Sequence, residues 1–231
     1  MRMVNKLLTI SAAVVLAAGM TACSSEEPVQ PTPSTTSLSF SGVEGAAHFD
    51  DGFLQIGSGV KVVDLYLDPM CPYCKKFEEL SGPALLEEAN AGKALLRVHP
   101  VAILNRLSQG TNYSTRAAAV LTAIAATSPA QLPQFLTTLY AHQPAENSPG
   151  LTNDQLVELA KQASATPITE ADIEKYTAWV DSQTTKAVAG PLPTRTQTRA
   201  ISQVPTVIVN GAVFNGNSTD PETFTTFYNS H

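Results

Sequence analysis

The chain has 231 residues, with 14 basic and 20 acidic side chains and a formal net charge of −6. This acidity argues against nucleic acid as a partner, because nucleic-acid-binding surfaces need clustered lysine and arginine. The length suits one domain, or one domain that carries a large insertion.

The first 22 residues are typical of a signal peptide. Two basic residues precede an almost wholly apolar run, residues 7–20, which is too short to span a bilayer core of about 30 Å comfortably. The small residue Ala22 directly before Cys23 resembles the end of a bacterial lipobox, in which the cysteine becomes the lipidated first residue of the mature chain. We therefore expect residues 1–22 to be removed and Cys23 to carry lipid. The alternative is an ordinary secretory signal with an incidental cysteine.

Residues 23–39 read as a flexible tether behind this lipidated cysteine. They are rich in serine, threonine and proline, and they lack the apolar side chains needed to bury a core. The folded part is therefore expected to begin near Phe40 and to run to His231.

The folded part begins with a strand–helix–strand pattern. Residues 50–59 alternate briefly and predict a short edge strand, whereas residues 60–67 are β-branched and apolar and predict a buried central strand. A helix should begin near Cys71, with a proline in its first turn. The Gly-Pro pair at 82–83 should kink or interrupt that helix. Residues 94–104 predict a second buried strand, which completes a βαβ unit.

The next part of the chain, residues 112–200, predicts four consecutive helices with no strand between them. Its apolar residues recur at helical spacing, and Thr152 and Gln155 have the spacing of a capping box. Tyr176 and Trp179 are expected in the core of this helical region.

The β pattern returns near the end of the chain. Residues 204–214 contain two apolar runs joined at Asn210-Gly211, which is a strong hairpin signal. A last helix is expected after Asp220, which can cap it, with Pro221 at its first position.

Apart from Cys23, the chain has only two cysteines, Cys71 and Cys74. A bridge between them would close a loop of four residues and would add little stability. A structural zinc site needs four ligands, commonly two close pairs, and the histidines do not pair at ligand spacing. We therefore expect no metal and no other cofactor. The histidines are His48, His99, His142 and His231.

The remaining explanation for the cysteine pair is redox chemistry. A C-x-x-C pair that opens a helix beside a βαβ unit is a thioredoxin-like signal. Cys71 should lie where the free N–H groups of a helix start favour an anion, which lowers its pKa from about 8.5. Cys74 should lie deeper and keep an ordinary or raised pKa. Pro72 should fix the backbone, and Tyr73 adds a ring without charge.

Two motifs together, DLYLDPMCPYCKKFE at residues 64–78 and QVPTVIVNG at residues 203–211, resemble the DsbA-like branch of the thioredoxin superfamily. The resemblance implies an α/β thioredoxin fold with an inserted all-helical domain. The first part of that fold would be residues 40–104, the insertion 105–200 and the second part 201–231. The interval between the motifs supports an insertion, because a bare fold needs only about 40 to 50 residues there.

The resemblance also implies roles for residues outside the cysteine pair. Pro205 would be cis and would face the cysteines, and the backbone of Val204 would pair with an extended substrate peptide. On the residues alone, Pro205 can equally be a proline at a strand start.

One position departs from the family pattern. Leu65 occupies the site where many thioredoxin-like proteins place a buried acid. Asp68 could instead assist proton transfer, or it could be a turn or cap residue. His99 is more typical of a strand or pocket residue than of a catalyst.

The function implied is that of a thiol–disulfide oxidoreductase that introduces disulfides into exported proteins. A lipid on Cys23 would hold it in the bilayer on the outer face of a bacterial cytoplasmic membrane. Its partners would be unfolded or reduced exported proteins and a membrane component that reoxidises the pair. Two alternatives stay open: a reductase or isomerase of the same fold, and a lipoprotein that only binds ligands on a thioredoxin scaffold.

Overall fold

The computed structural model describes residues 40–195 and 200–231. The predicted signal peptide, Cys23 and the tether lie outside the described residues. Within the described part, no helix is both long and apolar enough to cross a membrane.

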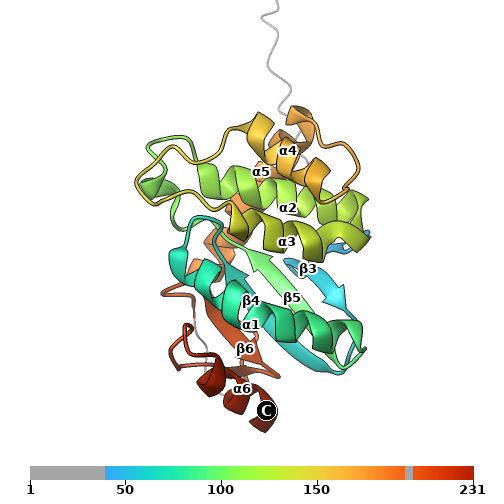
Figure 1. The fold of residues 1–231 in the computed structure, drawn as a ribbon, viewed down its shortest axis with the longest axis vertical. Coiled ribbons are helices and arrows are strands. Elements are labelled where there is room, and N and C mark those ends of the chain that lie inside the picture. Colours follow the sequence, from blue (N-terminus) through green and yellow to red (C-terminus); the bar gives the residue numbers. More distant parts are fainter. Residues whose placement is uncertain (1–39, 196–199) are drawn as a thin grey trace, which may run out of the picture. The chain divides into compact units, whose positions relative to one another are not determined.

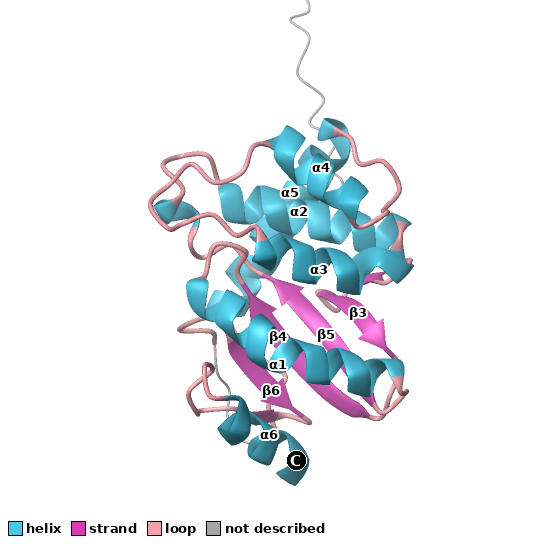
Figure 2. Ribbon diagram, in the orientation of Figure 1, coloured by secondary structure: helices cyan, strands magenta, loops and turns pink. Residues whose placement is uncertain are grey.

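Seven strands form one sheet in the order β1-β2-β3-β5-β4-β6-β7, as Figures 1 and 2 show for its larger strands. Strands β4 and β5 run parallel, and all other neighbouring strands are antiparallel. The strands are β1 (Val43–Glu44), β2 (Ala47–His48), β3 (Phe53–Gly57), β4 (Lys61–Leu67), β5 (Ala94–Pro100), β6 (Thr206–Val209) and β7 (Ala212–Val213).

The predicted central strand is confirmed, because β4 lies between β5 and β6. The prediction of an edge strand at residues 50–59 was wrong. β3 is followed in the sheet by the two-residue strands β2 and β1, which are too short to leave a β pattern in the sequence.

Helix α1 (Pro72–Asn90) connects β4 to β5 and completes the predicted βαβ unit. It continues through Pro83 without a break, so the predicted interruption does not occur. Proline removes one helical hydrogen bond, but the buried side chains Phe77 and Leu85 pack into the core on either side of it. Their burial holds both halves of the helix against the sheet.

Four helices follow β5, as predicted, and stack beyond one end of the sheet (Figure 1). Alanine-rich α2 is almost entirely buried and forms the centre of this layer. Trp179 of α5 is buried and donates its indole N–H to the carbonyl oxygen of Phe49, 3.2 Å away. The predicted capping box at Thr152 and Gln155 is present. The helices are α2 (Tyr113–Thr127), α3 (Leu132–Ala141), α4 (Asn153–Gln162) and α5 (Glu170–Ala189), with two 3₁₀ helices, η1 (Asn105–Leu107) and η2 (Pro129–Gln131).

The C-terminal hairpin and helix are also confirmed. Asn210 and Gly211 both have positive φ angles of 47° and 83°, the backbone that a tight two-residue hairpin turn between β6 and β7 requires. Helix α6 (Pro221–Ser230) is capped by Asp220, which accepts a hydrogen bond from the backbone N–H of Thr223. The sheet, its crossover helix and the inserted helices together form a thioredoxin fold with a helical insertion.

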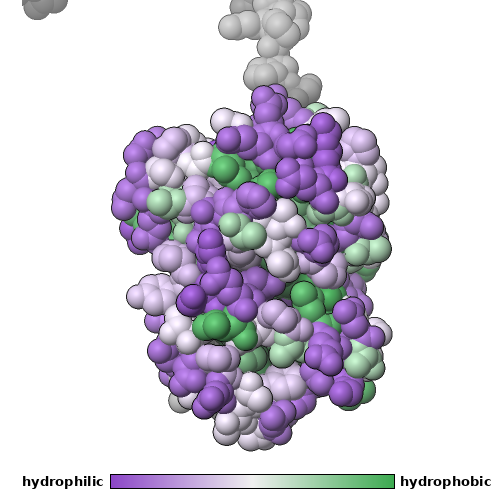
Figure 3. All heavy atoms as spheres, viewed as in Figure 1, coloured by the Kyte–Doolittle hydropathy of each residue, from purple (hydrophilic) through white to green (hydrophobic). Residues whose placement is uncertain are grey.

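The two faces of the sheet differ. Residues in alternate positions of β5 point to opposite faces. Leu96 and Val98 are buried in the core, whereas Arg97 and His99 line an open cavity on the other face. On the side of the molecule seen in Figure 3, hydrophilic residues dominate and the apolar patches are small and separate.

Candidate active site

The cysteine pair lies where β4 gives way to α1. Cys71 is the N-cap residue of the helix, with extended backbone angles of φ −77° and ψ 117°, and Pro72 is the first helical residue. No side chain in the described part of the chain caps this helix, so the N–H groups of its first turn are available to a sulfur anion. This confirms the predicted position of the helix start.

The two thiols are not joined by a disulfide, and their pKa values are shifted in opposite directions. The thiol of Cys74 hydrogen-bonds the sulfur of Cys71 and, as the largest effect, lowers the pKa of Cys71. The backbone N–H groups of Cys74 and Tyr73 lower it further, while burial opposes them. Burial raises the pKa of Cys74 well above its ordinary value. Cys71 therefore ionises more readily than an ordinary thiol, whereas Cys74 ionises less readily.

Val204 and Pro205, directly before strand β6, lie beside Cys71. The thiol of Cys71 donates a hydrogen bond to the carbonyl oxygen of Val204 over 3.3 Å. The peptide bond between Val204 and Pro205 is cis, in agreement with the family resemblance. Among the described residues, no hydrogen bond engages the backbone N–H of Val204.

A cavity of about 310 Å³ opens beside this junction. Tyr73, Val204, Pro205 and Phe214 are among the residues that line it. Tyr73 is 61% exposed, whereas Cys71 keeps only 4% of its surface accessible and Cys74 none. Access to the pair is therefore narrow, and the exposed ring and the proline segment define its borders.

Asp68 anchors the loop between β4 and the cysteines. Its carboxylate accepts hydrogen bonds from the N–H groups of Met70 and Leu104, at 2.8 Å each, and from the hydroxyl of Ser114 at 2.6 Å. Its carbonyl accepts from the N–H of Cys71 at 3.0 Å. Burial raises the pKa of Asp68 to about 6, against the effect of these donors. The geometry is that of the turn residue considered in the sequence analysis.

Comparison with known proteins places this arrangement in a family. A sequence profile described as "Thioredoxin" matches residues 58–228. The chain belongs to the thioredoxin family. None of the curated protein sequences compared with the chain matches it.

Several solved structures are similar to this chain. Reduced disulfide bond oxidoreductase DsbG from Mycobacterium tuberculosis has 25% identity and a TM-score of 0.61, with 76% of this chain and 85% of that chain covered. Oxidised DsbA from the same organism has 26% identity and a TM-score of 0.61, with coverage of 76% and 90%. Oxidised BdbD from Bacillus subtilis has 18% identity and a TM-score of 0.61, with coverage of 83% and 98%, and shares the fold.

The helical insertion of this thioredoxin-family chain reaches the cysteine loop through two residues that sequence reasoning missed. The side-chain amide of Gln143 donates to the carbonyl oxygens of Pro69 and Cys71, at 2.9 Å each. The hydroxyl of Tyr140 donates to the carbonyl of Asp68 at 3.2 Å. Nothing in the local pattern of Tyr140 or Gln143 marks this role, because it depends on how α3 packs against the loop.

A second buried acid, Glu78, lies on α1 one turn beyond Cys74. Its side chain is buried, and the hydroxyl of Thr137 donates to it over 3.4 Å. Burial raises the pKa of Glu78 to about 7. A β-carbon at Gly82 would lie 2.7 Å from the carboxyl carbon of Glu78, so glycine leaves the space that this side chain occupies. The sequence signal was the helical spacing, since Glu78 follows Cys74 by four residues and so lies on the same face of the helix.

Other residues named from the sequence lie elsewhere. His99 is a residue of β5 that lines the cavity on the far face of the sheet, which confirms its interpretation as a strand or pocket residue. Tyr176 and Trp179 are both buried in α5. In the described part of the chain, no group of three or more histidine, cysteine or acidic residues could hold a metal ion.

Proposed function

We propose that this protein is an extracytoplasmic thiol–disulfide oxidoreductase that introduces disulfides into exported proteins through Cys71 and Cys74. The observation that carries the proposal is the opposite displacement of the two thiol pKa values at the start of α1. The similarity to two solved proteins described as a disulfide bond oxidoreductase and as DsbA, at 25% and 26% identity, supports it.

In the proposed reaction, the pair begins as a Cys71–Cys74 disulfide. A substrate thiolate attacks the sulfur of Cys71, the intramolecular bond breaks, and Cys74 leaves and takes up a proton. A second substrate thiolate then attacks the substrate sulfur of the mixed disulfide, and Cys71 leaves as a thiolate. The substrate loses two electrons and gains a disulfide, while the pair gains those electrons.

Residues near the pair would hold the substrate during this exchange. The N–H of Val204, which has no hydrogen-bond partner among the described residues, suits pairing with an extended peptide laid beside β6. The peptide carbonyl or N–H groups would pair with Val204, and neighbouring side chains would enter the cavity beside Tyr73 and Phe214. In the free protein, the Cys71 thiol donates a hydrogen bond to the carbonyl oxygen of Val204, and a bound peptide would compete for that oxygen.

The same pKa difference supports one direction of the reaction. A stabilised thiolate stabilises the reduced protein, and this makes the disulfide form a stronger oxidant. We therefore favour an oxidase over a reductase or isomerase. Equilibration with glutathione, followed by quantification of the two redox forms, should give a potential well above the approximately −270 mV of a reducing thioredoxin. A potential at or below that value would assign the reductase direction.

Activity should be measured with a reduced, unfolded protein that contains two cysteines. The oxidised full chain should generate its disulfide, and the Cys71→Ser variant should not. A Cys23→Ser variant is the matched control, because it also removes one cysteine but should keep the exchange activity. If Cys71→Ser supports the cell as well as the parent chain does, the function is that of a binding lipoprotein on a thioredoxin scaffold.

The proposed location is the outer face of the cytoplasmic membrane, with a lipid on Cys23, residues 1–22 removed and residues 23–39 as the tether. Reoxidation would then depend on a component of that membrane. Mass spectrometry of the mature chain should find a lipid-modified N-terminal cysteine, and Cys23→Ser should release the protein from the membrane fraction. A mature chain that carries no lipid and begins at a residue other than Cys23 would instead indicate an ordinary secretory signal.

A further inference from the structure

The buried carboxylate of Asp68 joins three segments of the chain beside the cysteine pair. Its side chain has no accessible surface. Met70 in the cysteine loop, Leu104 in the loop after β5 and Ser114 at the start of α2 each donate one hydrogen bond to it. The backbone carbonyl of Asp68 accepts from the N–H of Cys71, so the carboxylate belongs to the same tight turn as Cys71.

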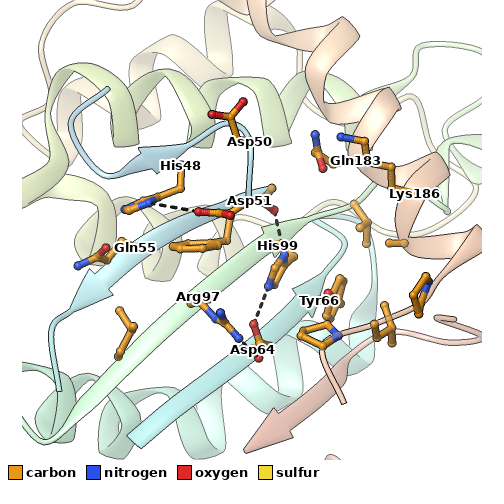
Figure 4. A pocket seen from close by; sticks show the side chains of 18 residues that line it. His48, Asp50, Asp51, Gln55, Asp64, Tyr66, Arg97, His99, Gln183 and Lys186 are labelled. Atoms are coloured by element: carbon orange, nitrogen blue, oxygen red, sulfur yellow. Dashed lines mark hydrogen bonds and ion pairs between the residues drawn. The ribbon is translucent and has the colours of Figure 1, made fainter. Parts of the chain in front are cut away.

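In residues 40–195 and 200–231, no basic side chain balances the charge of Asp68. Two N–H groups and one hydroxyl are the groups there that bond its carboxylate, and no cation acts on it. Asp64 differs, because Arg97 binds it at 2.7 Å and His99 contacts it at 2.9 Å on the other face of the sheet (Figure 4). Charges in a buried site are screened weakly, so the field of Asp68 reaches the nearby sulfurs.

The charge of Asp68 acts on both thiols. The hydrogen bond from Cys74 is the largest influence on the pKa of Cys71 and lowers it, whereas the charge of Asp68 raises it. Burial is the largest influence on the pKa of Cys74 and raises it, and the charge of Asp68 adds to that effect. Asp68 therefore opposes the thiolate of Cys71 that the start of α1 and Cys74 favour, because like charges disfavour each other.

The hydrogen bonds around Asp68 permit both of its protonation states. The N–H groups of Met70 and Leu104 can only donate, but the hydroxyl of Ser114 can either donate or accept. A proton on the oxygen that faces Ser114 would reverse that one bond, and both N–H groups would keep an acceptor. A change in the charge of Asp68 therefore does not require the turn to open.

The charge of Asp68 changes within an ordinary pH range. Burial, with a smaller contribution from the charge of Glu146, raises the pKa of Asp68 to about 6. Tyr113 in α2 and Tyr140 in α3 also lie near Asp68, but burial raises both of their pKa values, so they stay neutral in this range. The other groups whose charges act on Asp68 or respond to it are therefore Glu146, on the loop after α3, and the two thiols.

We propose that Asp68 sets how strongly the Cys71–Cys74 disulfide oxidises, by controlling the balance between the thiol and thiolate forms of Cys71. Two electrons and one proton convert the disulfide into a Cys71 thiolate and a Cys74 thiol. Ionised Asp68 destabilises this reduced pair and lowers the reduction potential, and protonated Asp68 allows the potential to rise. Asp68 is a positioning residue that acts through its charge. The inference rests on the proposed function, because it assumes that the pair cycles between dithiol and disulfide.

The test compares Asp68→Asn with the parent chain by equilibration with glutathione between pH 4.5 and pH 8.5. At pH 8.5 the equilibrium constant for reduction of the disulfide should be about tenfold higher in Asp68→Asn, which corresponds to about 30 mV. At pH 4.5, where the carboxyl group of the parent is also neutral, the two proteins should agree. The potential of the parent should therefore change its slope with pH near pH 6, and that of Asp68→Asn should not.

Two matched variants separate the charge of Asp68 from its hydrogen bonds. Ser114→Ala removes one donor but keeps the carboxyl group, so its potential should equal that of the parent at pH 8.5. Its change of slope should move to higher pH, because the lost donor no longer stabilises the carboxylate. Asp64→Asn removes another buried carboxylate, on the other face of the sheet, and should leave the potential unchanged at every pH.

Equal potentials of Asp68→Asn and the parent chain at pH 8.5 would overturn the proposal. A difference that persists undiminished at pH 4.5, or an equal rise in Ser114→Ala at pH 8.5, would also overturn it, since hydrogen bonding in the turn would then set the potential. If Asp68→Asn does not fold, Ser114→Ala decides, because an unmoved change of slope excludes Asp68 as the titrating group. If Cys71→Ser supports the cell as the parent does, the proposed function fails, but these potentials still test the role of Asp68.

Discussion

Replacing Glu78 with glutamine should remove a defined part of the pH dependence of stability. Burial raises the pKa of Glu78 from 4.5 to about 7. Between these values the folded state retains a proton that the unfolded chain releases, so the free energy of unfolding falls as the pH rises from about 4.5 to about 7. With about 1.4 kcal/mol for each pKa unit, ionised Glu78 costs the folded state about 3 kcal/mol above pH 7.

The Glu78→Gln variant should therefore match the parent chain near pH 4 and exceed its free energy of unfolding by up to about 3 kcal/mol at pH 8. Urea titrations of the reduced protein at pH 4, 6 and 8 measure this difference. The fluorescence of Trp179 can follow unfolding, because Trp179 is buried and is the single tryptophan of the chain. Asp68 and the thiols also titrate, but they are present in both proteins and their contributions cancel in the comparison.

Glu79→Gln is the matched control for this experiment. Glu79 is the next residue on the same helix, with a side chain that is 44% exposed and near two lysines. Its replacement should change stability by less than about 1 kcal/mol at any of these pH values. If Glu78→Gln and the parent chain lose stability in parallel between pH 4 and pH 8, Glu78 is ionised in the folded state at neutral pH and the reasoning from burial fails.

Three further outcomes are expected. Gln143→Leu should lower the free energy of unfolding by about 1 to 3 kcal/mol in urea titrations, because two loop carbonyls lose a donor; an unchanged midpoint would contradict this. Cys74→Ala should raise the pKa of Cys71, measured by thiolate absorbance, because it removes the largest cause of the lowering; an equal or lower pKa would exclude that hydrogen bond. Gly82→Ala should destabilise the parent chain by about 1 to 3 kcal/mol, because its β-carbon would clash with the side chain of Glu78. In a Glu78→Ala background the same substitution should destabilise the protein much less, and thermal unfolding of the double variant measures the difference.

The parts of the fold that were predicted correctly depend on local patterns. The β-branched run before the cysteines, the Asn210-Gly211 turn and the cap at Asp220 each encode their structure within a few residues. The cis bond at Pro205 was expected from family resemblance, since the residues alone allow an ordinary strand-start proline. The two-residue strands that extend the sheet beyond β3 are too short to leave a periodic signal.

The parts of the candidate site that were missed depend on contacts between distant segments. Gln143 and Tyr140 support the cysteine loop only because α3 packs beside it. The largest cause of the lowered Cys71 pKa is a hydrogen bond from Cys74. From the sequence we expected the N–H groups at the start of the helix to lower it. Outside the site, on the other face of the sheet, the ion pair between Asp64 and Arg97 needs the register of β4 with β5, which hydrophobic periodicity does not specify.

The hydrogen bonds from the inserted helices to the cysteine loop have a consequence for engineering. Ser114, Tyr140 and Gln143 all belong to the insertion, and each donates to the segment between Asp68 and Cys71. A miniature protein made by deleting those helices would keep the CPYC motif but would leave its supporting carbonyls and the Asp68 carboxylate short of donors. Grafting this motif onto a simpler scaffold should therefore include α2, α3 and the residues up to Gln143, which supply these donors.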